Sequence, residues 1–294
     1  MNFFGKELPV FKANLHTHTK NSDGGYTAEE VIELYSGKGY DILAFTDHRK
    51  PNKVSACDGK GMTLISGIEL HPEGPRGIKW HLLALNVPED FPGEYKTADD
   101  AITAVLVAGG IVFCAHPHWC GLTSQDVLRL PGLSGIEVYN TSCRFIGKDY
   151  NDQCWDELTS AGFIHGALAV DDTHSSCHLF GGWTMIAAED KSVPSIMNAL
   201  AQGNYYATQG PEFYSLELEG RVFKAEFSEA VEVNLIGINS TGVCITAPDY
   251  PNYGDNITLT SFERELPPHI KGVVRCRIRN KEGKYAWTPP VIVE

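Results

Sequence analysis

The chain has 294 residues, a formal net charge of −13 and 43% hydrophobic residues, which is an ordinary composition for a folded protein. A chain of this length buries a large core without disulfides and has room for one large domain and a smaller one. The acidic charge argues against binding of long nucleic acid or anionic membranes, because both need clustered Lys and Arg. Taken alone, it also argues against small anionic substrates.

Membrane insertion and secretion are not indicated. No stretch approaches the roughly 18 apolar residues of a membrane span, and residues 1–10 lack the pattern of a signal peptide. The eight cysteines include no C-x-x-C pair, and Cys114 lies in an apolar run typical of a buried thiol. These features predict a cytoplasmic protein with reduced cysteines and leave its oligomeric state open.

Apolar strand-like runs alternate with helical patterns up to about residue 210, which predicts a mostly parallel sheet or barrel. Thr27 and Glu30 form a capping box before the first helix, and Gly39 is a stop signal after it. The predicted strands are 11–15, 42–46, 63–68, 81–85, 111–115, 135–139 and 167–170, and the predicted helices are 28–38, 98–108, 124–129, 151–160 and 193–201.

The pattern changes after residue 211, where short extended segments such as 229–238 and 285–293 dominate. About five to seven antiparallel strands in a small β-sandwich are predicted here. The domain boundary is placed at 208–213, so residues 1–210 and 211–294 form the two predicted domains. One predicted strand has a basic face that is expected to be exposed to solvent, made by Arg275, Arg277 and Arg279.

Histidines and acids recur at the ends of the predicted strands. His16 and His18 end the first strand, and residues i and i+2 of a strand face the same side, so the two imidazoles point together. In βα barrels the active site lies at the carboxyl ends of the strands, so the recurrence predicts one shared site. The candidate metal ligands are His16, His18, Asp23, His48, Glu69, His81, His116, Asp172 and His174.

Nine candidate ligands suggest two or three divalent ions, because one metal takes four to six ligands. A carboxylate such as Glu69 is expected to bridge two of them. Mixed imidazole and carboxylate ligands suit Zn, Mn or Fe and do not separate these metals. Four other histidines are expected to be structural, namely His71, His165, His178 and His269.

These motifs, in this order, resemble the PHP superfamily, named for polymerase and histidinol phosphatase. The resemblance covers roughly residues 11–210 and rests on His16-Thr-His18-Thr-x-x-Ser-Asp23-Gly, Thr46-Asp47-His48, Gly67-Ile68-Glu69, His81-Leu-Leu-Ala-Leu, Ala115-His116-Pro117 and Asp172-Thr-His174. The segments Tyr206-Ala-Thr-x-Gly-Pro211 and Gly283-Lys-x-Ala286-Trp-Thr-x-Pro290 resemble a PHP subgroup with a C-terminal β-domain, which includes carbamate hydrolase-like proteins.

The resemblance implies a distorted (β/α)7 barrel, related to amidohydrolases, that holds two or three divalent metals and mostly hydrolyses phosphoesters. It implies three ligand groups, with Glu69 shared by the first two. They are His16, His18, Glu69 and Asp172; Glu69, His81 and His116; and Asp23, His48 and His174. Two positions depart from the family pattern beside the site, Arg49-Lys50-Pro51 after His48 and Asp171 before Asp172, and both are expected to alter the substrate pocket.

The function expected from these features is hydrolysis of a small phosphorylated molecule by metal-activated water, without a phospho-enzyme. Asp23, His48, Glu69, His116 and His174 are the expected catalytic residues, and Arg49, His118, Arg144 and Lys148 are the expected substrate-binding residues. Two alternatives remain open. One is a carbamate or amide hydrolase on the same metal centre, and the other is a non-catalytic metal-bearing binding protein.

Overall fold

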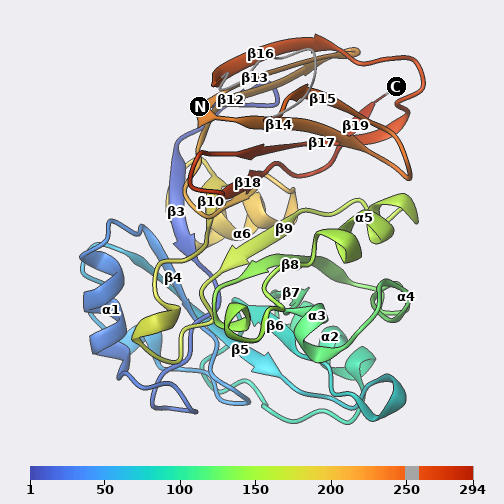
Figure 1. Cartoon of the computed structure of the whole chain (residues 1–294). Helices are drawn as coiled ribbons and strands as arrows, with labels where there is room; N and C mark the ends of the chain where they lie inside the picture. Colours follow the sequence, from blue (N-terminus) through green and yellow to red (C-terminus); the bar gives the residue numbers. More distant parts are fainter. Residues whose placement is uncertain (249–257, 294) are drawn as a thin grey trace.

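The computed structural model describes residues 1–248 and 258–293, so residues 249–257 and 294 of the predicted C-terminal domain lie outside it. Its strands form two sheets, one of 14 strands and one of five. Helices pack against the larger sheet, whereas the C-terminal strands lie together at one end of the molecule (Figure 1). The mixed α/β fold predicted from the sequence is therefore confirmed.

Seven strands of the larger sheet are neighbours in chain order, and each agrees with a predicted strand to within two residues at either end. Most of their residues are buried on both faces, which explains why they read as continuous apolar runs. The strands are β3 (Val10–Asn14), β4 (Ile42–Phe45), β5 (Thr63–Leu70), β6 (Leu82–Leu85), β7 (Ile111–Cys114), β8 (Leu133–Asn140) and β9 (Ala167–Val170).

Strand β6 runs against the direction of its neighbours. It pairs antiparallel with β5 and with β7, and Leu82 at its start lies opposite Leu70 and Cys114 at the ends of those strands. The residue before β6, His81, therefore lies at the same edge of the sheet as the residues that follow β5 and β7.

The helices are short and begin at recognisable caps. The Thr27–Glu30 capping box is present at the first helix, which ends at Ser36, two residues before the predicted end, with Gly37 donating its N–H to the Glu33 carbonyl. No helix in the described part of the chain is long and apolar enough to cross a membrane. The α-helices are α1 (Ala28–Ser36), α2 (Ala98–Val107), α3 (Pro117–Cys120), α4 (Ser124–Val127), α5 (Asp152–Ser160) and α6 (Val193–Ala201), and the 3-10 turns are Val54–Ala56, Pro75–Gly77, Ser142–Ile146 and Ser176–His178.

Two strands that the sequence analysis did not predict continue the larger sheet. Strand β10 (Trp183–Ala187) pairs antiparallel with β3, and β11 (Tyr205–Thr208) pairs antiparallel with β10. The far end of the sheet, β9, approaches β10 through the Thr184 hydroxyl, which bonds both the N–H and the carbonyl of Ala169.

The C-terminal region contains eight strands among its described residues, more than the five to seven predicted. The predicted strand 229–238 is divided at residue 231, where the chain passes from one sheet to the other. The strands are β12 (Phe213–Glu219), β13 (Val222–Ala230), β14 (Glu232–Gly237), β15 (Gly242–Thr246), β16 (Leu259–Glu265), β17 (Gly272–Arg279), β18 (Tyr285–Trp287) and β19 (Val291–Val293).

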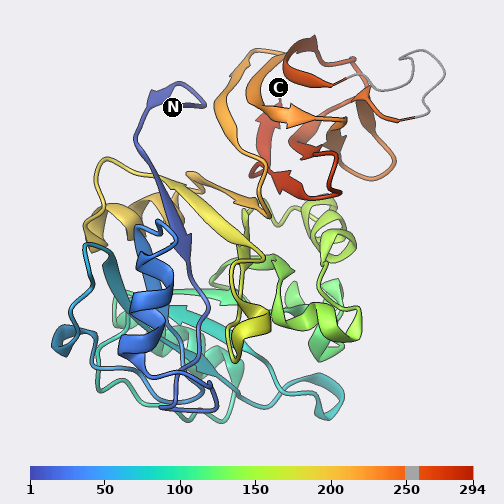
Figure 2. The ribbon, with the colours of Figure 1, turned by 60° about the vertical axis from the view of Figure 1, so that its left-hand side comes forward.

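The two sheets enclose one apolar cluster in this region, which includes Phe223 and Phe227 from one sheet and Leu235 and Ile278 from the other. The first residues of the chain take part as well. Strand β1 (Asn2–Phe3) pairs with β12, and β2 (Lys6–Glu7) pairs with β1. The N-terminal segment thus lies beside the C-terminal strands (Figure 2).

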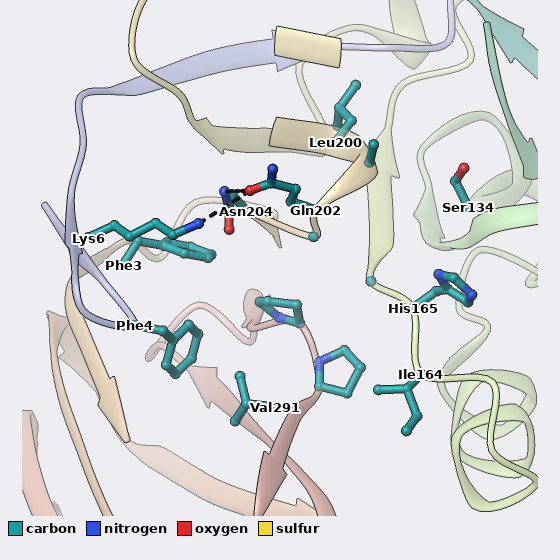
Figure 3. Close-up of a pocket in the computed structure, with 15 residues that line it drawn as sticks. Phe3, Phe4, Lys6, Ser134, Ile164, His165, Leu200, Gln202, Asn204 and Val291 are labelled. Atoms are coloured by element: carbon teal, nitrogen blue, oxygen red, sulfur yellow. Dashed lines mark hydrogen bonds between the residues drawn. The ribbon is translucent and has the colours of Figure 1, made fainter. Parts of the chain in front are cut away.

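A cavity of about 400 Å³ lies between residues 3–6, near the N-terminus, and residues 289–291, near the C-terminus. Residues 164–166 and 200–204 form most of its remaining wall. Figure 3 shows Phe3, Phe4 and Lys6 on one side, facing the turn after α6 and the segment around Val291. The Lys6 ammonium donates to Gln202 Oε1 at 3.2 Å across one edge of this cavity. Strand β18 of the C-terminal region pairs with β11 in the larger sheet. Backbone hydrogen bonds therefore join the C-terminal region directly to the first 210 residues.

The basic face of β17 is not exposed as expected. Arg275 is buried, donates to the carboxylate of Asp156 on α5, and lies 4.4 Å from the ring centroid of Trp155. Arg277 and Arg279 both pair with Glu232, at 3.0 and 2.7 Å. The exposure predicted from alternation is wrong because β17 is an interior strand, between β14 and β18, and this face packs toward α5.

The Arg275–Asp156 pair gives a stability prediction. Asp156→Ala leaves a buried guanidinium without its carboxylate, which should lower the free energy of unfolding by about 2–3 kcal/mol. Glu229→Ala removes the exposed pair with Lys281 and should cost about 0.5 kcal/mol. Urea denaturation of both variants measures the difference. Adding Arg275→Met to Asp156→Ala should recover part of the loss, and equal small effects of Asp156→Ala and Glu229→Ala would contradict the interpretation.

Candidate metal centre

The nine predicted ligands converge on one edge of the larger sheet. Parallel bridges between Thr17 and Thr173 and between His48 and Glu69 continue the sheet past its regular strands. The side chains come from the segments after β3, β4, β7 and β9, from the end of β5, where Glu69 is the penultimate residue, and from the residue before β6. The reversal of β6 is what places His81 in this group.

The centre of the cluster contains two imidazoles and two carboxylates. The Nε2 atoms of His16 and His18 lie 3.5 and 3.4 Å from Glu69 Oε2. The same two nitrogens lie 3.4 and 3.0 Å from Asp172 Oδ1. All four residues are buried, with exposed fractions of 5% or less. The structure therefore brings the first predicted ligand group together.

The other oxygen of Glu69 faces a second pair of histidines. Glu69 Oε1 lies 2.6 Å from His81 Nδ1 and 3.4 Å from His116 Nε2. One carboxylate thus contacts both the first and the second ligand group, which is the arrangement required of a bridging ligand.

The third group gathers around Asp23, which is exposed. Asp23 Oδ2 lies 3.4 Å from His48 Nε2, and Asp23 Oδ1 lies 3.4 Å from His174 Nε2 and 3.8 Å from His18 Nδ1. The ligand atoms of these four residues all lie within 4.8 Å of one another.

Three polar atoms at the centre of the cluster form no hydrogen bond with any described residue. Glu69 Oε2, Asp172 Oδ1 and His18 Nδ1 are buried and have no hydrogen-bond partner among the described residues. Burying such atoms without a partner is costly, and a cation in contact with them removes that cost. Because mixed imidazole and carboxylate sets are the ligands of divalent Zn, Mn and Fe, the residues present fit the metals expected from the sequence.

The charge of the cluster is balanced internally. Burial would raise the pKa of Glu69, but His81 and His16 hold that pKa well below its usual range. Burial also opposes ionisation of Asp172, yet His16 and His18 hold its pKa well below the usual range. Both carboxylates are therefore ionised at neutral pH, which is the form that binds cations.

Strained backbone accompanies two of the candidate ligands. His116 has φ of 25° and Asp172 has φ of 52°, in a region that non-glycine residues seldom adopt. Such conformations cost on the order of 1–3 kcal/mol and cluster at functional sites. The N–H of His116 donates to Glu137 and that of Asp172 donates to the His16 carbonyl, and these hydrogen bonds hold both residues in place.

Glu137 is a buried residue of the site that the sequence analysis did not assign. Its Oε1 bonds His16 Nδ1 at 2.6 Å, and its Oε2 accepts from the N–H of His116 and from Asn140 Nδ2. This leaves His16 Nε2 free to face the centre of the cluster. A glutamate inside the apolar strand β8 was the available signal, because a buried acid needs partners.

His71 was expected to be structural, and the structure places it beside the cluster instead. Its Nε2 lies 2.8 Å from His48 Nδ1 and 3.9 Å from Glu69 Oε2. Burial lowers the pKa of His71 to about 3, so its imidazole is neutral. The available signal was its position two residues after Glu69, the same spacing that pairs His16 with His18.

Two cavities open onto the cluster. The inner one, of about 230 Å³, is lined by seven of the candidate ligands together with Trp119, Ser142 and Cys143. The ring of Trp119 packs edge-on against His81 and His116. The outer cavity, of about 510 Å³, is lined by His48, Arg49, Lys50, His71, His81 and Glu94.

The predicted substrate-binding residues have different locations. Arg49 lines the outer cavity and pairs with Glu94 at 3.3 Å. Arg144 lies beyond the inner cavity, where it donates to the Cys177 carbonyl and covers the ring of Phe145. Lys148 follows on the same loop and is partly exposed. His118 lines neither cavity of the cluster but a neighbouring one with Tyr150 and Asn151.

Asp171 was expected to alter the substrate pocket, but its side chain points elsewhere. It is fully buried and accepts hydrogen bonds from the Tyr35 and Thr141 hydroxyls. It also accepts from the backbone N–H groups of residues 180–182. Asp171 therefore holds that loop against α1 and is absent from the lining of the inner cavity.

Comparison with known proteins supports the fold. No protein-family model matches the chain. A phosphoribosyl 1,2-cyclic phosphate 1,2-diphosphodiesterase from Eggerthella lenta is 36% identical over 84 residues, 27% of this chain, and the chain spans only 32% of that relative's length.

Among solved structures, a two-domain protein from Bacteroides vulgatus containing a predicted PHP-like metal-dependent phosphoesterase is similar over 99% of this chain and 98% of its own, with 15% identity and a TM-score of 0.55. An amidohydrolase from Chromobacterium violaceum covers 56% of this chain and 88% of its own, with 17% identity and a TM-score of 0.45. The chain thus shares the fold of the two-domain protein from Bacteroides vulgatus.

The contacts of Glu137 give a prediction on metal binding. Glu137→Gln keeps the shape of the side chain but weakens its hold on the His16 imidazole, so the affinity for divalent ions should fall about 10–100-fold. Metal content after dialysis against graded chelator concentrations measures this loss. Glu226→Gln, an exposed change on β13, should bind metal like the unaltered chain, and identical affinities for both variants would contradict the role of Glu137.

Proposed function

We propose that the protein is a metal-dependent phosphoesterase that hydrolyses a small phosphorylated molecule with water as the nucleophile. One observation carries the proposal: the two oxygens of a fully buried glutamate, Glu69, face separate groups of histidines at the wall of one cavity. The names of the two-domain neighbour and of the partly matching diphosphodiesterase support phosphate esters as the substrate class.

The proposed ligand groups are those that the resemblance implied. The first consists of His16, His18, Glu69 and Asp172, the second of Glu69, His81 and His116, and the third of Asp23, His48 and His174. Two or three divalent ions, Zn, Mn or Fe, would occupy them. When bound, such ions lower the pKa of water enough to supply hydroxide near neutral pH and neutralise the charge of phosphate oxygens.

The residues of the chain then have distinct tasks. Asp23, His48 and His174 lie at the partly exposed side of the cavity, where they meet an entering phosphate group. Glu69 and His116 are buried and hold the inner side in fixed geometry. Trp119 forms part of the cavity wall and packs against His81 and His116.

Direct attack by water is favoured over a covalent intermediate. The thiol that lines the inner cavity, Cys143, is buried, and burial raises the pKa of this thiol, so it stays protonated and is a poor nucleophile. The hydroxyl in the lining, Ser142, has no histidine or lysine among its hydrogen-bond partners in the described structure to activate it.

We propose further that residues 1–210 form a distorted (β/α)7 barrel and residues 211–294 a β-sandwich domain. The contacts between β9 and β10 support closure of the barrel, and the shared apolar cluster supports the sandwich. Eight free thiols support a reducing compartment such as the cytoplasm. The acidic charge supports a small substrate over long nucleic acid or a membrane.

A substrate panel tests the proposal. The metal-loaded protein should hydrolyse phosphate mono- or diesters in preference to aryl carbamates and amides. Asp172→Asn retains the shape of the side chain and the left-handed backbone, which Asn tolerates, but should lower kcat/KM more than about 100-fold, beyond the effect of a residue outside the ligand shell.

Asp58→Ala, an exposed change, is the control for this experiment. Turnover of carbamates or amides alone would favour the hydrolase alternative. Turnover of none of the three classes by metal-loaded protein would favour the binding-protein alternative, and activity of Asp172→Asn with its metal lost would contradict the assigned centre.

Arg49 gives a prediction on substrate binding. Its guanidinium lines the outer cavity next to His48, in reach of an anionic group beyond the scissile phosphate. Arg49→Met should therefore raise KM about tenfold with a smaller change in kcat, since a charge-assisted hydrogen bond is lost. Steady-state kinetics measures both constants, and Lys224→Met, a partly exposed change on β13, is the control. An unchanged KM would remove Arg49 from the substrate site.

A further inference from the structure

Three histidines of the proposed centre, His16, His116 and His174, share one mode of support. Each of the three presents Nε2 to the cluster and has its outer nitrogen, Nδ1, held by a neighbour. His16 Nδ1 bonds Glu137 at 2.6 Å, and His174 Nδ1 bonds the Asp172 carbonyl at 2.9 Å. His116 Nδ1 contacts the thiol of Cys120 at 3.4 Å. Such outer partners fix the tautomer and the ring orientation of a metal ligand.

His48 follows the same pattern with a different partner. Its Nε2 faces Asp23 at 3.4 Å, and its Nδ1 faces His71 Nε2 at 2.8 Å. Glu69 Oε2 is also 2.7 Å from His48 Nδ1, yet this oxygen has no hydrogen-bond partner in the described part of the chain. The contact that meets hydrogen-bond geometry at His48 Nδ1 is therefore the one with His71.

The His71 ring is held firmly in this position. Its side chain is 7% exposed, and the ring packs edge-on against His81 and His48, with centroid distances of 4.2 and 4.7 Å. His71 is the first residue after β5 and follows Glu69 by two residues. The strand that positions the bridging carboxylate therefore also positions this imidazole. The ring borders the outer cavity beside Arg49.

We propose that His71 is a positioning residue for the third metal group. Its Nε2 accepts the Nδ1–H of His48, which fixes the tautomer in which the His48 Nε2 lone pair faces Asp23 and His174. His71 then carries its own proton on Nδ1. The inference rests on the proposed metal centre and adds a residue outside its nine ligands.

Direct ligation by His71 is the competing arrangement, because His48, Glu69 and His71 also lie close enough to hold an ion. An ion between His48 Nδ1 and His71 Nε2 would take the nitrogen whose proton the first arrangement requires. A neutral His48 would then carry its proton on Nε2 and could not bind an ion with Asp23 and His174. The two arrangements therefore exclude each other and predict different variants.

The test compares His71→Phe with His71→Gln in the full chain. The glutamine Oε1 replaces His71 Nε2 as an acceptor, whereas phenylalanine fills the space without one. We expect His71→Phe to bind one ion per chain about 10–100-fold more weakly, measured by Zn²⁺ titration and metal analysis, and His71→Gln to stay within about threefold of the unaltered protein. His165→Phe, outside the cluster, is the control.

Nitrogen-15 NMR of the Zn²⁺-loaded protein gives a second readout. The His48 Nδ1–H should be observed in the unaltered protein and in His71→Gln, and should exchange rapidly with water in His71→Phe. Equal metal loss in both His71 variants, with a metal-induced shift of His71 nitrogen in the unaltered protein, would show direct ligation and overturn the inference. Unchanged metal binding in His71→Phe would also overturn it.

The experiment distinguishes a failure of the proposed metal centre from a failure of the role proposed for His71. If the unaltered protein bound no divalent ion, the metal centre itself would be wrong, and the inference would fall with it. If the unaltered protein bound its ions and only the His71 comparison failed, the centre would stand and the role of His71 alone would be rejected.

Discussion

The burial of negative charge at one edge of the sheet is the constraint on which the rest of the site depends. Glu69 and Glu137 are fully buried and Asp172 is 5% exposed, and an unpaired carboxylate in such surroundings is very costly. The fold meets this cost by bringing histidines from six separate segments to the same place. No single segment supplies enough partners, so the site exists only when the strands are assembled.

Assembly explains features that look irregular in isolation. The reversed strand β6 brings His81 to the carboxyl ends of β5 and β7, where a parallel strand would have carried it to the opposite edge. The left-handed backbone at His116 and Asp172 aims two further ligands inward. Every residue that lines the inner cavity lies between Asp23 and His174, so the C-terminal strands contribute to the fold without contributing to this wall.

The sequence was sufficient to predict strands that are buried on both faces. It was not sufficient to predict features that depend on which neighbouring element packs alongside. Strands β3 to β9 were predicted closely because both faces are apolar, and the nine candidate ligands follow directly from their ends. The direction of β6, the short strands β10 and β11 and the burial of Arg275 depend on which element packs alongside, and local periodicity does not contain that information. Glu137 and His71 could have been recognised from the sequence, because Glu137 is an acid inside the apolar strand β8 and His71 follows Glu69 by two residues.

The formal charge of −13 takes on a different meaning once the acids are located. Three of them, Asp23, Glu69 and Asp172, face imidazoles in the cluster. Two or three divalent ions bound there would add about four to six positive charges, and bound ions dominate the local field of such sites. An acidic protein can therefore offer a cationic pocket to a small phosphate. The net charge of the whole chain leaves the sign of the substrate's charge free.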